Sequence, residues 1–361
     1  MKIKSVILAC LFTLSFFSCS MEDENVLIDM DRELSNTDKG DSAMAALTVN
    51  VFVNQLATKA VPTEGETTEH IKDTEAINDC SIILLGSDNK VIDARDNVSV
   101  KEIAGVDNKL AVNTKFALKQ QNDLKVVVIA NTSQSFAACN SMDDINVVVQ
   151  NAKDLGTLVK MGIKDGISTE NKTYDNPENV SIELHQLAAR IELASFNITK
   201  KSFSKTLPVD VTLTKVTLLN VNNGCKTILT NNEDNTIGSS NVKFGKENIS
   251  VYKGATESNI AFTEENKPIF YSFPKTVSGE DKVFTEGNKS VTMKIEFKVG
   301  DIAYTKYYKI QYSNGTSSVK SGYLYRLNVN MTAESNEVEF DVTCSVNDWN
   351  NNIIEIPMED M

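Results

Sequence analysis

Histidine is scarce in this sequence of 361 residues, which contains only His70 and His185. Few sites in the chain could therefore support catalysis that depends on histidine. The sequence also lacks a glycine-rich phosphate loop, a His-Glu-x-x-His motif and a Gly-x-Ser-x-Gly motif. His185 is more simply explained as a packing or hydrogen-bonding residue. These absences predict a protein that is not an enzyme, with no catalytic residues and no cofactor, although a pair of glycosidase carboxylates would leave no local signature.

Basic residues and tryptophan are also few. The 36 lysines and arginines are outnumbered by 49 acidic residues, which gives a formal net charge of -13. A nucleic-acid-binding surface needs positive charge, so we expect no nucleic-acid partner. The single tryptophan, Trp349, offers little for stacking on sugar rings. Binding of glycans by a surface lipoprotein is therefore the less favoured alternative, because it needs exposed aromatic rings for stacking.

Long apolar runs are absent after the N-terminus. The one such run extends from Val6 to Phe17, behind Lys2 and Lys4. It is shorter than the roughly 20 residues of a transmembrane helix, and its basic flank is typical of a secretory signal peptide. Residues 1–18 are therefore predicted to be a signal peptide.

The end of this signal resembles a bacterial lipobox, with the sequence Phe16-Phe17-Ser18-Cys19. The resemblance implies that Cys19 is lipidated and becomes the first exported residue, held by a lipid anchor in the outer membrane. The acidic residues that follow, Glu22 to Glu24, resemble the export signal of Bacteroidetes surface lipoproteins. The alternative is an ordinary signal peptide with an incidental cysteine.

Four cysteines remain beyond Cys10 and Cys19: Cys80, Cys139, Cys225 and Cys344. They are widely separated, and no two have the spacing of metal ligands. We expect no metal site, and either free buried thiols or one or two disulfides.

Most of the chain has the pattern of β-strands. Apolar and polar residues alternate in three segments, Val291–Val299, Tyr323–Met331 and Val338–Val346, as in antiparallel strands with one buried face. Leu124–Ala130 is instead apolar at every position but Lys125 and is predicted to be a central strand covered on both faces. The pattern predicts an all-β fold with one or two short helices, built from β-sandwiches.

One helix is predicted to begin after Ser141, whose side chain can cap it. Helical spacing then places five apolar residues on one stripe: Ile145, Val148, Val149, Ala152 and Leu155. The segment from Asn222 to Asn241 is rich in Asn, Thr, Gly and Ser and is predicted to be a loop.

Five segments, in order, resemble the FimA-type major fimbrial subunits, the fimbrillins or type V pilins of Bacteroidales. They are Ala46–Ala60, Ile77–Leu85, Leu124–Asn131, Leu184–Leu193 and Val342–Trp349. The resemblance implies two transthyretin-like Greek-key β-sandwich domains in tandem, at 60–185 and 186–361. They would follow an acidic propeptide at 19–59 that carries a removable first β-strand.

The residues of this first strand suit the same interpretation. Four apolar side chains face one way, Leu47, Val49, Val51 and Val53, and polar residues alternate with them. A polar stretch, Thr63–Thr74, follows and is predicted to be an exposed loop, where a protease can reach the chain. We expect cleavage between Lys59 and Ala60 by a trypsin-like or gingipain-like protease.

Loss of this strand would leave an apolar groove with unpaired backbone groups, which favours pairing with a strand from another subunit. The C-terminal tail offers such a donor strand, with Ile354, Ile356 and Met358 at alternate positions. Pro357 has no backbone N–H and limits where the donor can pair. The expected partners are other copies of the chain and accessory fimbrial subunits, in a fimbria that serves adhesion.

Several alternatives stay open. The tail could simply complete the second sandwich, and Lys59 could be an ordinary surface lysine, with Arg32, Lys39 and Lys72 as lesser cleavage candidates. An accessory anchor subunit would keep its first strand and lipid, and a tip subunit would lack a usable donor.

Overall fold

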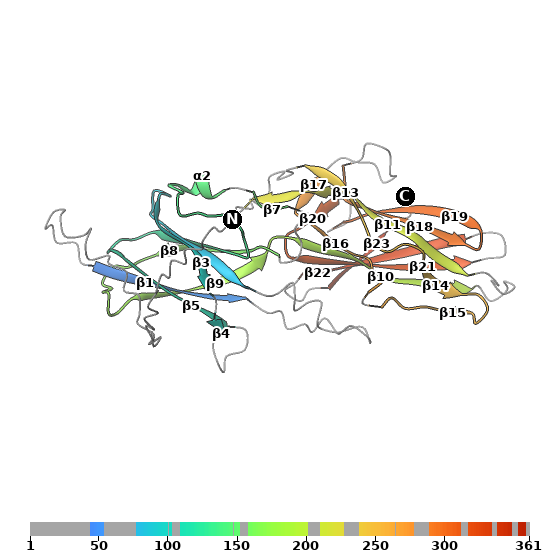
Figure 1. Ribbon diagram of the computed structural model, residues 1–361, viewed down its shortest axis with the longest axis horizontal. Coiled ribbons are helices and arrows are strands. Elements are labelled where there is room, and N and C mark those ends of the chain that lie inside the picture. The colour runs from blue at the N-terminus through green and yellow to red at the C-terminus, as the bar shows by residue number, and fades with distance from the viewer. Residues whose placement is uncertain are drawn as a thin grey trace, which may run out of the picture. The chain divides into compact units, whose positions relative to one another are not determined.

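The structure is a computed structural model. It describes residues 44–53, 77–99, 101–102, 109–146, 148–151, 158–200, 210–226, 238–263, 265–277, 289–311, 317–333, 338–348 and 353–358. Within these ranges the regular secondary structure is almost entirely β-strand, which confirms the all-β prediction (Figure 1). None of the helices in this part of the chain is long and apolar enough to cross a membrane.

The first half of the described chain forms one eight-stranded sheet. Its order is β3 (Val91–Ser99), β2 (Asp79–Leu85), β6 (Leu124–Ala130), β8 (Lys160–Ile167), β9 (Glu178–Gln186), β1 (Met44–Val53), β5 (Lys109–Lys119) and β4 (Lys101–Glu102). β8 and β9 pair at only two positions, Lys160 with Gln186 and Met161 with His185. The sheet therefore folds over at this point, and side chains from β2 and β6 meet those from β1, β5 and β9 in one core.

β2 and β6 lie in the middle of their layer and are buried on both faces. Val126 and Val128 of β6 face the core shared with β1, whereas Val127 and Ile129 belong to a second core with Phe136. This arrangement confirms the prediction that Leu124–Ala130 is a central strand. It also explains the apolar run, since the residues from Val126 to Ala130 are buried on both faces of the strand.

Asp96 on β3 holds the segment Ser135–Ala137, whose Phe136 packs against Val127 and Ile129 of β6. Its carboxylate accepts hydrogen bonds from the hydroxyl of Ser135 at 2.7 Å, from the N–H of Phe136 at 2.9 Å and from the N–H of Ala137 at 3.1 Å. Burial by itself would raise the pKa of Asp96, but these hydrogen bonds and one from Ser81 hold it below its ordinary value of 3.8. Asp96 therefore favours the packed position of Ser135–Ala137 while it is ionised.

The second half of the chain forms a five-stranded sheet and a six-stranded sheet. One has the order β16 (Ile269–Ser272), β10 (Ala189–Lys200), β21 (Tyr323–Ala333), β22 (Val338–Asp348) and β23 (Ile353–Met358). The other has the order β15 (Ser258–Asn259), β14 (Ile249–Lys253), β11 (Val211–Asn222), β18 (Thr292–Val299) and β19 (Ile302–Lys309), with β13 (Ser239–Lys243) also paired to β11. Two short pairs complete the described strands: β7 (Val148–Asn151) with β12 (Gly224–Lys226), and β17 (Lys275–Val277) with β20 (Ser317–Val319).

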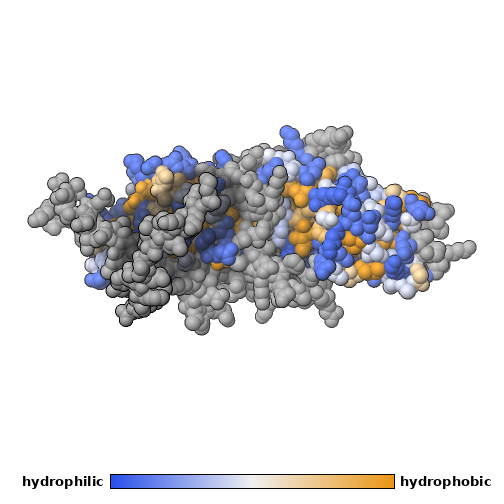
Figure 2. All heavy atoms as spheres, viewed as in Figure 1, coloured by the Kyte–Doolittle hydropathy of each residue, from blue (hydrophilic) through white to orange (hydrophobic). Residues whose placement is uncertain are grey.

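The five-stranded and six-stranded sheets enclose a common core. Val291, Met293, Ile295 and Phe297 are buried there from the β18 side, and Tyr325, Leu327, Val329 and Met331 from β21. The alternation predicted for these two segments is therefore confirmed. Figure 2 shows hydrophilic and hydrophobic residues interleaved on the visible described surface.

The helix prediction is right only at its start. α2 covers Met142–Ile145, and Ser141 caps it together with Asp144 in a capping box. The predicted continuation is wrong, because the chain re-enters a strand at Val148 and pairs with β12. The consecutive β-branched residues Val147, Val148 and Val149 favour the extended conformation of a strand. Ala152 and Leu155 lie outside the described residues. The predicted loop at Asn222–Asn241 is also interrupted, by β12 and the start of β13.

The chain passes from the first set of strands to the second between β9 and β10. The Ser321 hydroxyl donates hydrogen bonds to the carbonyls of Gln186 at 2.6 Å and Leu187 at 3.0 Å. The N–H of Gly322 donates to the carbonyl of Ala188 at 3.1 Å. This passage lies next to the predicted domain boundary at residue 185, which stays a prediction. His185, which was expected to pack or form a hydrogen bond, is exposed.

Candidate functional site

The first strand lies between two strands that come from distant parts of the chain. β1 pairs antiparallel with β5 from Met44 to Phe52, and parallel with β9 from Leu47 to Val53. In the strand order of the sheet, β1 separates β9 from β5 (Figure 1). We call the position between β5 and β9 that Met44–Val53 fill the β1 site.

The side chains of β1 divide between the core and the outer face. Leu47, Val49 and Val51 are at most 1% exposed and pack in the core with β2 and β6. Thr48 and Asn50, between them, are half-buried. The side chain of Val53 lies outside the described residues. Three apolar contacts and two backbone ladders thus hold the strand, and whether it is removable stays a prediction.

The ladder between β1 and β5 is irregular near one residue. Val49 pairs with Thr114 and Val51 with Leu110, so the ladder advances two residues on β1 and four on β5. Asn50, between the two valines, has no partner on β5 in this ladder but pairs with Ser181 of β9. This is a β-bulge or a related irregularity, a feature that locally interrupts backbone pairing.

β9, the other wall of the β1 site, depends on a glycine in β8. A Cβ atom at Gly162 would lie 2.3 Å from the carbonyl oxygen of Glu183 and 2.6 Å from Ile182 Cγ2. Both distances are shorter than atoms can tolerate, so β8 can cross β9 this closely only without a side chain at residue 162.

On the β5 side, two cations lie over aromatic rings. The Arg95 guanidinium of β3 lies 4.4 Å from the centroid of the Phe116 ring, and Phe116 pairs with Leu47 of β1. Lys115 Nζ lies 3.7 Å from the centroid of the Tyr174 ring, which is 46% exposed. Such contacts stabilise the cation over the negative face of the ring. Arg95 also forms an ion pair with Asp93 at 3.2 Å, so the positive charge next to Thr48 of the β1 site comes from Lys115.

The proposed donor strand lies at a sheet edge of its own chain. β23 pairs antiparallel with β22 from Ile353 to Met358, with Ile356 opposite Cys344 and Pro357 opposite Thr343. It is the last strand in the order of its sheet. The donor positions Ile354, Ile356 and Met358 are therefore placed on an edge strand, where a proline is tolerated, and their use by another subunit stays a prediction.

Three predicted sites lie outside the described residues: the lipidation site Cys19 and the two sides of the cleavage site, Lys59 and Ala60. Cys80 and Cys139 are free thiols, so neither forms a disulfide. Burial raises the pKa of Cys80 to about 12, which keeps this thiol protonated and unreactive. Within the described ranges, no group of three or more His, Cys, Asp or Glu could hold a metal ion.

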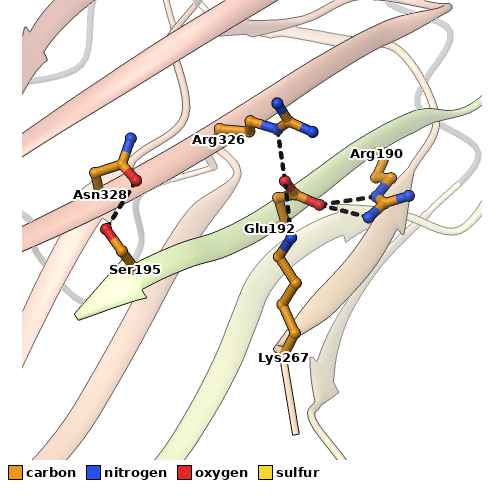
Figure 3. A network of polar contacts seen from close by, with 6 residues as sticks. All are labelled: Arg190, Glu192, Ser195, Lys267, Arg326 and Asn328. Carbon is orange, nitrogen blue, oxygen red and sulfur yellow. Dashed lines mark hydrogen bonds and ion pairs between the residues drawn. The ribbon is translucent and has the colours of Figure 1, made fainter. Parts of the chain in front are cut away.

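A buried ion cluster at the start of β10 was not predicted (Figure 3). The Glu192 carboxylate is fully buried and accepts hydrogen bonds from Arg190 Nη2 at 2.6 Å and from Arg326 Nε at 2.7 Å. Lys267 Nζ lies 3.7 Å away from it. Burial by itself would raise the pKa of Glu192, but Arg190, Lys267 and Arg326 together hold it below its ordinary value.

The cluster links three neighbouring strands of the five-stranded sheet: β10, β21 and the start of β16. Glu192 on β10 pairs directly with Arg326 on β21, and Lys267 comes just before β16. Charged residues at 190 and 192, alternating with Ile191 and Leu193, were the sequence signal for this site. Gly162 and Arg95, by contrast, left no local signal, because their roles depend on strands far away in the sequence.

Comparisons with known proteins show the fold. No family model matches the chain, and no curated protein matches it. Among solved structures, the tip fimbrial protein Mfa3 from Porphyromonas gingivalis, with a C-terminal truncation, matches at 11% identity and a TM-score of 0.53, over 85% of this chain and 100% of that chain. The fimbrilin FimA from Porphyromonas gingivalis W83 matches at 13% identity and a TM-score of 0.52, over 84% of this chain and 98% of that chain. The chain therefore shares the fold of these fimbrial proteins.

Proposed function

We propose that this chain is a structural pilin subunit of a cell-surface fimbria that serves adhesion. It is exported as a lipoprotein through Cys19, cleaved after Lys59, and joined to other copies and accessory subunits by donor-strand exchange. Two features support a structural role rather than an enzymatic one: the fold shared with fimbrial proteins and the scarcity of histidine.

The observation that carries the proposal is the position of β1. A strand near the beginning of the chain lies in the interior of a sheet, and its apolar side chains reach the core. If β1 leaves, β5 and β9 each lose a backbone ladder and the core loses three side chains. Exposed ladders and an exposed apolar surface favour the addition of another strand.

The free energy of burying the β1 side chains favours replacement of β1 by another strand over its unaided dissociation. Full burial of Leu47, Val49 and Val51 contributes roughly 4 to 9 kcal/mol as an upper bound, at about 1.5 to 3 kcal/mol each. A subunit cut after Lys59 therefore keeps β1 bound until a comparable strand replaces it. Ile354, Ile356 and Met358 supply similar apolar bulk at the same spacing.

The test is limited trypsin digestion of the full exported chain. Cleavage after Lys59, identified by N-terminal sequencing, is expected to convert monomers into a ladder of oligomers. The variant Lys59→Gln should block both cleavage and assembly, whereas Lys72→Gln, at a lesser candidate site, should block neither. Deletion of residues 350–361 should permit cleavage but abolish the ladder. If the trimmed chain stays monomeric and the deletion changes nothing, the chain is not a polymerising pilin.

A tip or anchor subunit is the second candidate, favoured by the pairing of β23 with β22. A tail that completes its own sheet is less available to a neighbour. This reading predicts that the chain accepts a strand or keeps β1, but donates none. Mixing the trimmed chain with a trimmed Δ350–361 chain separates the two roles: a stalk subunit inserts its tail into the Δ350–361 chain and gives mixed oligomers, and a tip subunit gives none.

A further inference from the structure

We propose that Glu355 and Pro357 fix the register in which the donor strand enters the β1 site of the next subunit. The inference rests on the proposed function. In the aligned register, Ile354, Ile356 and Met358 replace Leu47, Val49 and Val51 one for one. Glu355 then takes the position of Thr48, and Pro357 takes the position of Asn50.

Apolar spacing alone does not choose the register. A donor that runs in the direction of β1 keeps its apolar face toward the core whenever it shifts by two residues, because side chains alternate along a strand. Two shifted registers therefore compete with the aligned one. The forward register places Ile354 at Val49, and the backward register places it at Ala45.

Proline distinguishes these registers. Proline has no backbone N–H, and within sheets it is confined to edges, first residues and bulges. The aligned register places Pro357 at Asn50, which has no partner on β5 and pairs only with Ser181 of β9. The forward register places it at Phe52 and the backward register at Thr48, and both of these positions pair regularly with β5 and with β9.

The charge of Glu355 also favours the aligned register over the two shifted ones. In the aligned register Glu355 lies directly opposite Lys115 of β5, the partner of Thr48. Directly opposite charges on one face of a sheet attract. The forward register places Glu355 at Asn50, which has no β5 partner, and the backward register buries it at Ala46, which is 0% exposed. Burying an unpaired carboxylate there is costly.

The same proline also suits the strand before exchange. In the free subunit β23 is an edge strand, and a proline on an edge discourages uncontrolled pairing with other chains. Pro357 is therefore tolerated at the edge of its own sheet and at the interrupted ladder of the neighbour. Regular positions inside a sheet are unfavourable for it.

Engineered disulfides between subunits read out the register. Directly opposite residues on antiparallel strands have Cα atoms close enough for a disulfide. The pair Glu355→Cys with Lys115→Cys reports the aligned register, and Glu355→Cys with Ala117→Cys reports the backward one. Ile353→Cys with Lys115→Cys reports the forward register. Each pair is placed in the full chain, trimmed with trypsin, oxidised and mapped by peptide mass spectrometry.

We expect cross-linked oligomers mainly from the aligned pair, and Pro357→Ala should let the shifted pairs cross-link as well. Glu355→Lys should slow assembly about two- to fivefold at low salt, and adding Lys115→Glu should restore the rate. Oligomers that cross-link mainly through a shifted pair would overturn the register while leaving strand exchange intact. A failure to form any oligomer after trimming would overturn strand exchange itself, and the register with it.

Discussion

Truncation of one buried β1 side chain should loosen the first strand selectively. Val49 is fully buried and lies between Thr114 of β5 and Val180 of β9. Val49→Ala removes roughly 1.6 kcal/mol of apolar burial, at about 0.8 kcal/mol for each carbon lost. The remaining cavity raises the total cost to about 2 kcal/mol. In the uncut chain this loss lowers the free energy of unfolding.

In the cut chain the same loss acts on the release of β1. The contacts of β1 break before the strand leaves, so about 2 kcal/mol corresponds to about a 30-fold faster release, at 1.36 kcal/mol per factor of ten. The assay labels the fragment that ends at Lys59 and follows its dissociation after cleavage, with an excess of a peptide of residues 350–361 as competitor.

Thr48→Ala is the matched control, because Thr48 is on the same strand but half-buried on the opposite face. It should change the release rate by no more than about twofold, as expected for a substitution away from the core. Equal release rates for Val49→Ala and Thr48→Ala would refute the reasoning that core contacts hold β1.

Three further substitutions test the supporting structure. Gly162→Ala should destabilise the fold, because the new methyl group overlaps the backbone of β9, whereas Gly245→Ala meets nothing within 4 Å and should be nearly neutral in thermal unfolding. Glu192→Gln should cost about 3 kcal/mol in urea unfolding, because it removes the buried negative charge beside Arg190, Lys267 and Arg326. Glu265→Gln, in an exposed ion pair, should cost less than about 1 kcal/mol. Asp96→Asn should destabilise the protein at neutral pH.

The pH dependence of the last variant has a definite sign. The folded pKa of Asp96 lies below its ordinary value of 3.8, so its contribution is complete above that value and is lost as the pH falls through the folded pKa. The difference between Asp96→Asn and the original chain should therefore shrink in acid, and a constant difference would contradict the role of the ionised carboxylate. Equal melting temperatures for Gly162→Ala and Gly245→Ala would contradict the close crossing of β8 and β9. Equal costs for Glu192→Gln and Glu265→Gln would contradict the importance of burial at Glu192.

Local patterns predicted the strands well. Alternation at Val291–Val299 and the nearly continuous apolar run at Leu124–Ala130 each reflect how many faces of a strand are buried, and burial leaves a pattern in the sequence. The helix after Ser141 failed because local spacing cannot register a distant partner. Val148 pairs with a strand more than 70 residues away along the sequence, and that pairing decides its conformation.

The β1 site was only partly predictable for the same reason. The inward face of Leu47, Val49 and Val51 follows from alternation, but its walls come from β5 and β9, which no local signal identifies. The interrupted ladder at Asn50 and the close approach at Gly162 appear only when those strands are assembled. Asn50 and Gly162, which affect the pairing register and the packing of β9, are therefore the part of the β1 site that local sequence patterns did not predict.

The N-terminus of the assembled subunit tests strand exchange most directly. Fimbriae sheared from cells that produce the chain would be dissociated and each subunit analysed by intact mass and N-terminal sequencing. We predict a subunit that begins at Ala60 and retains residues 350–361. Assembled subunits that still begin at Cys19 and contain Met44–Val53 would contradict the removal of β1.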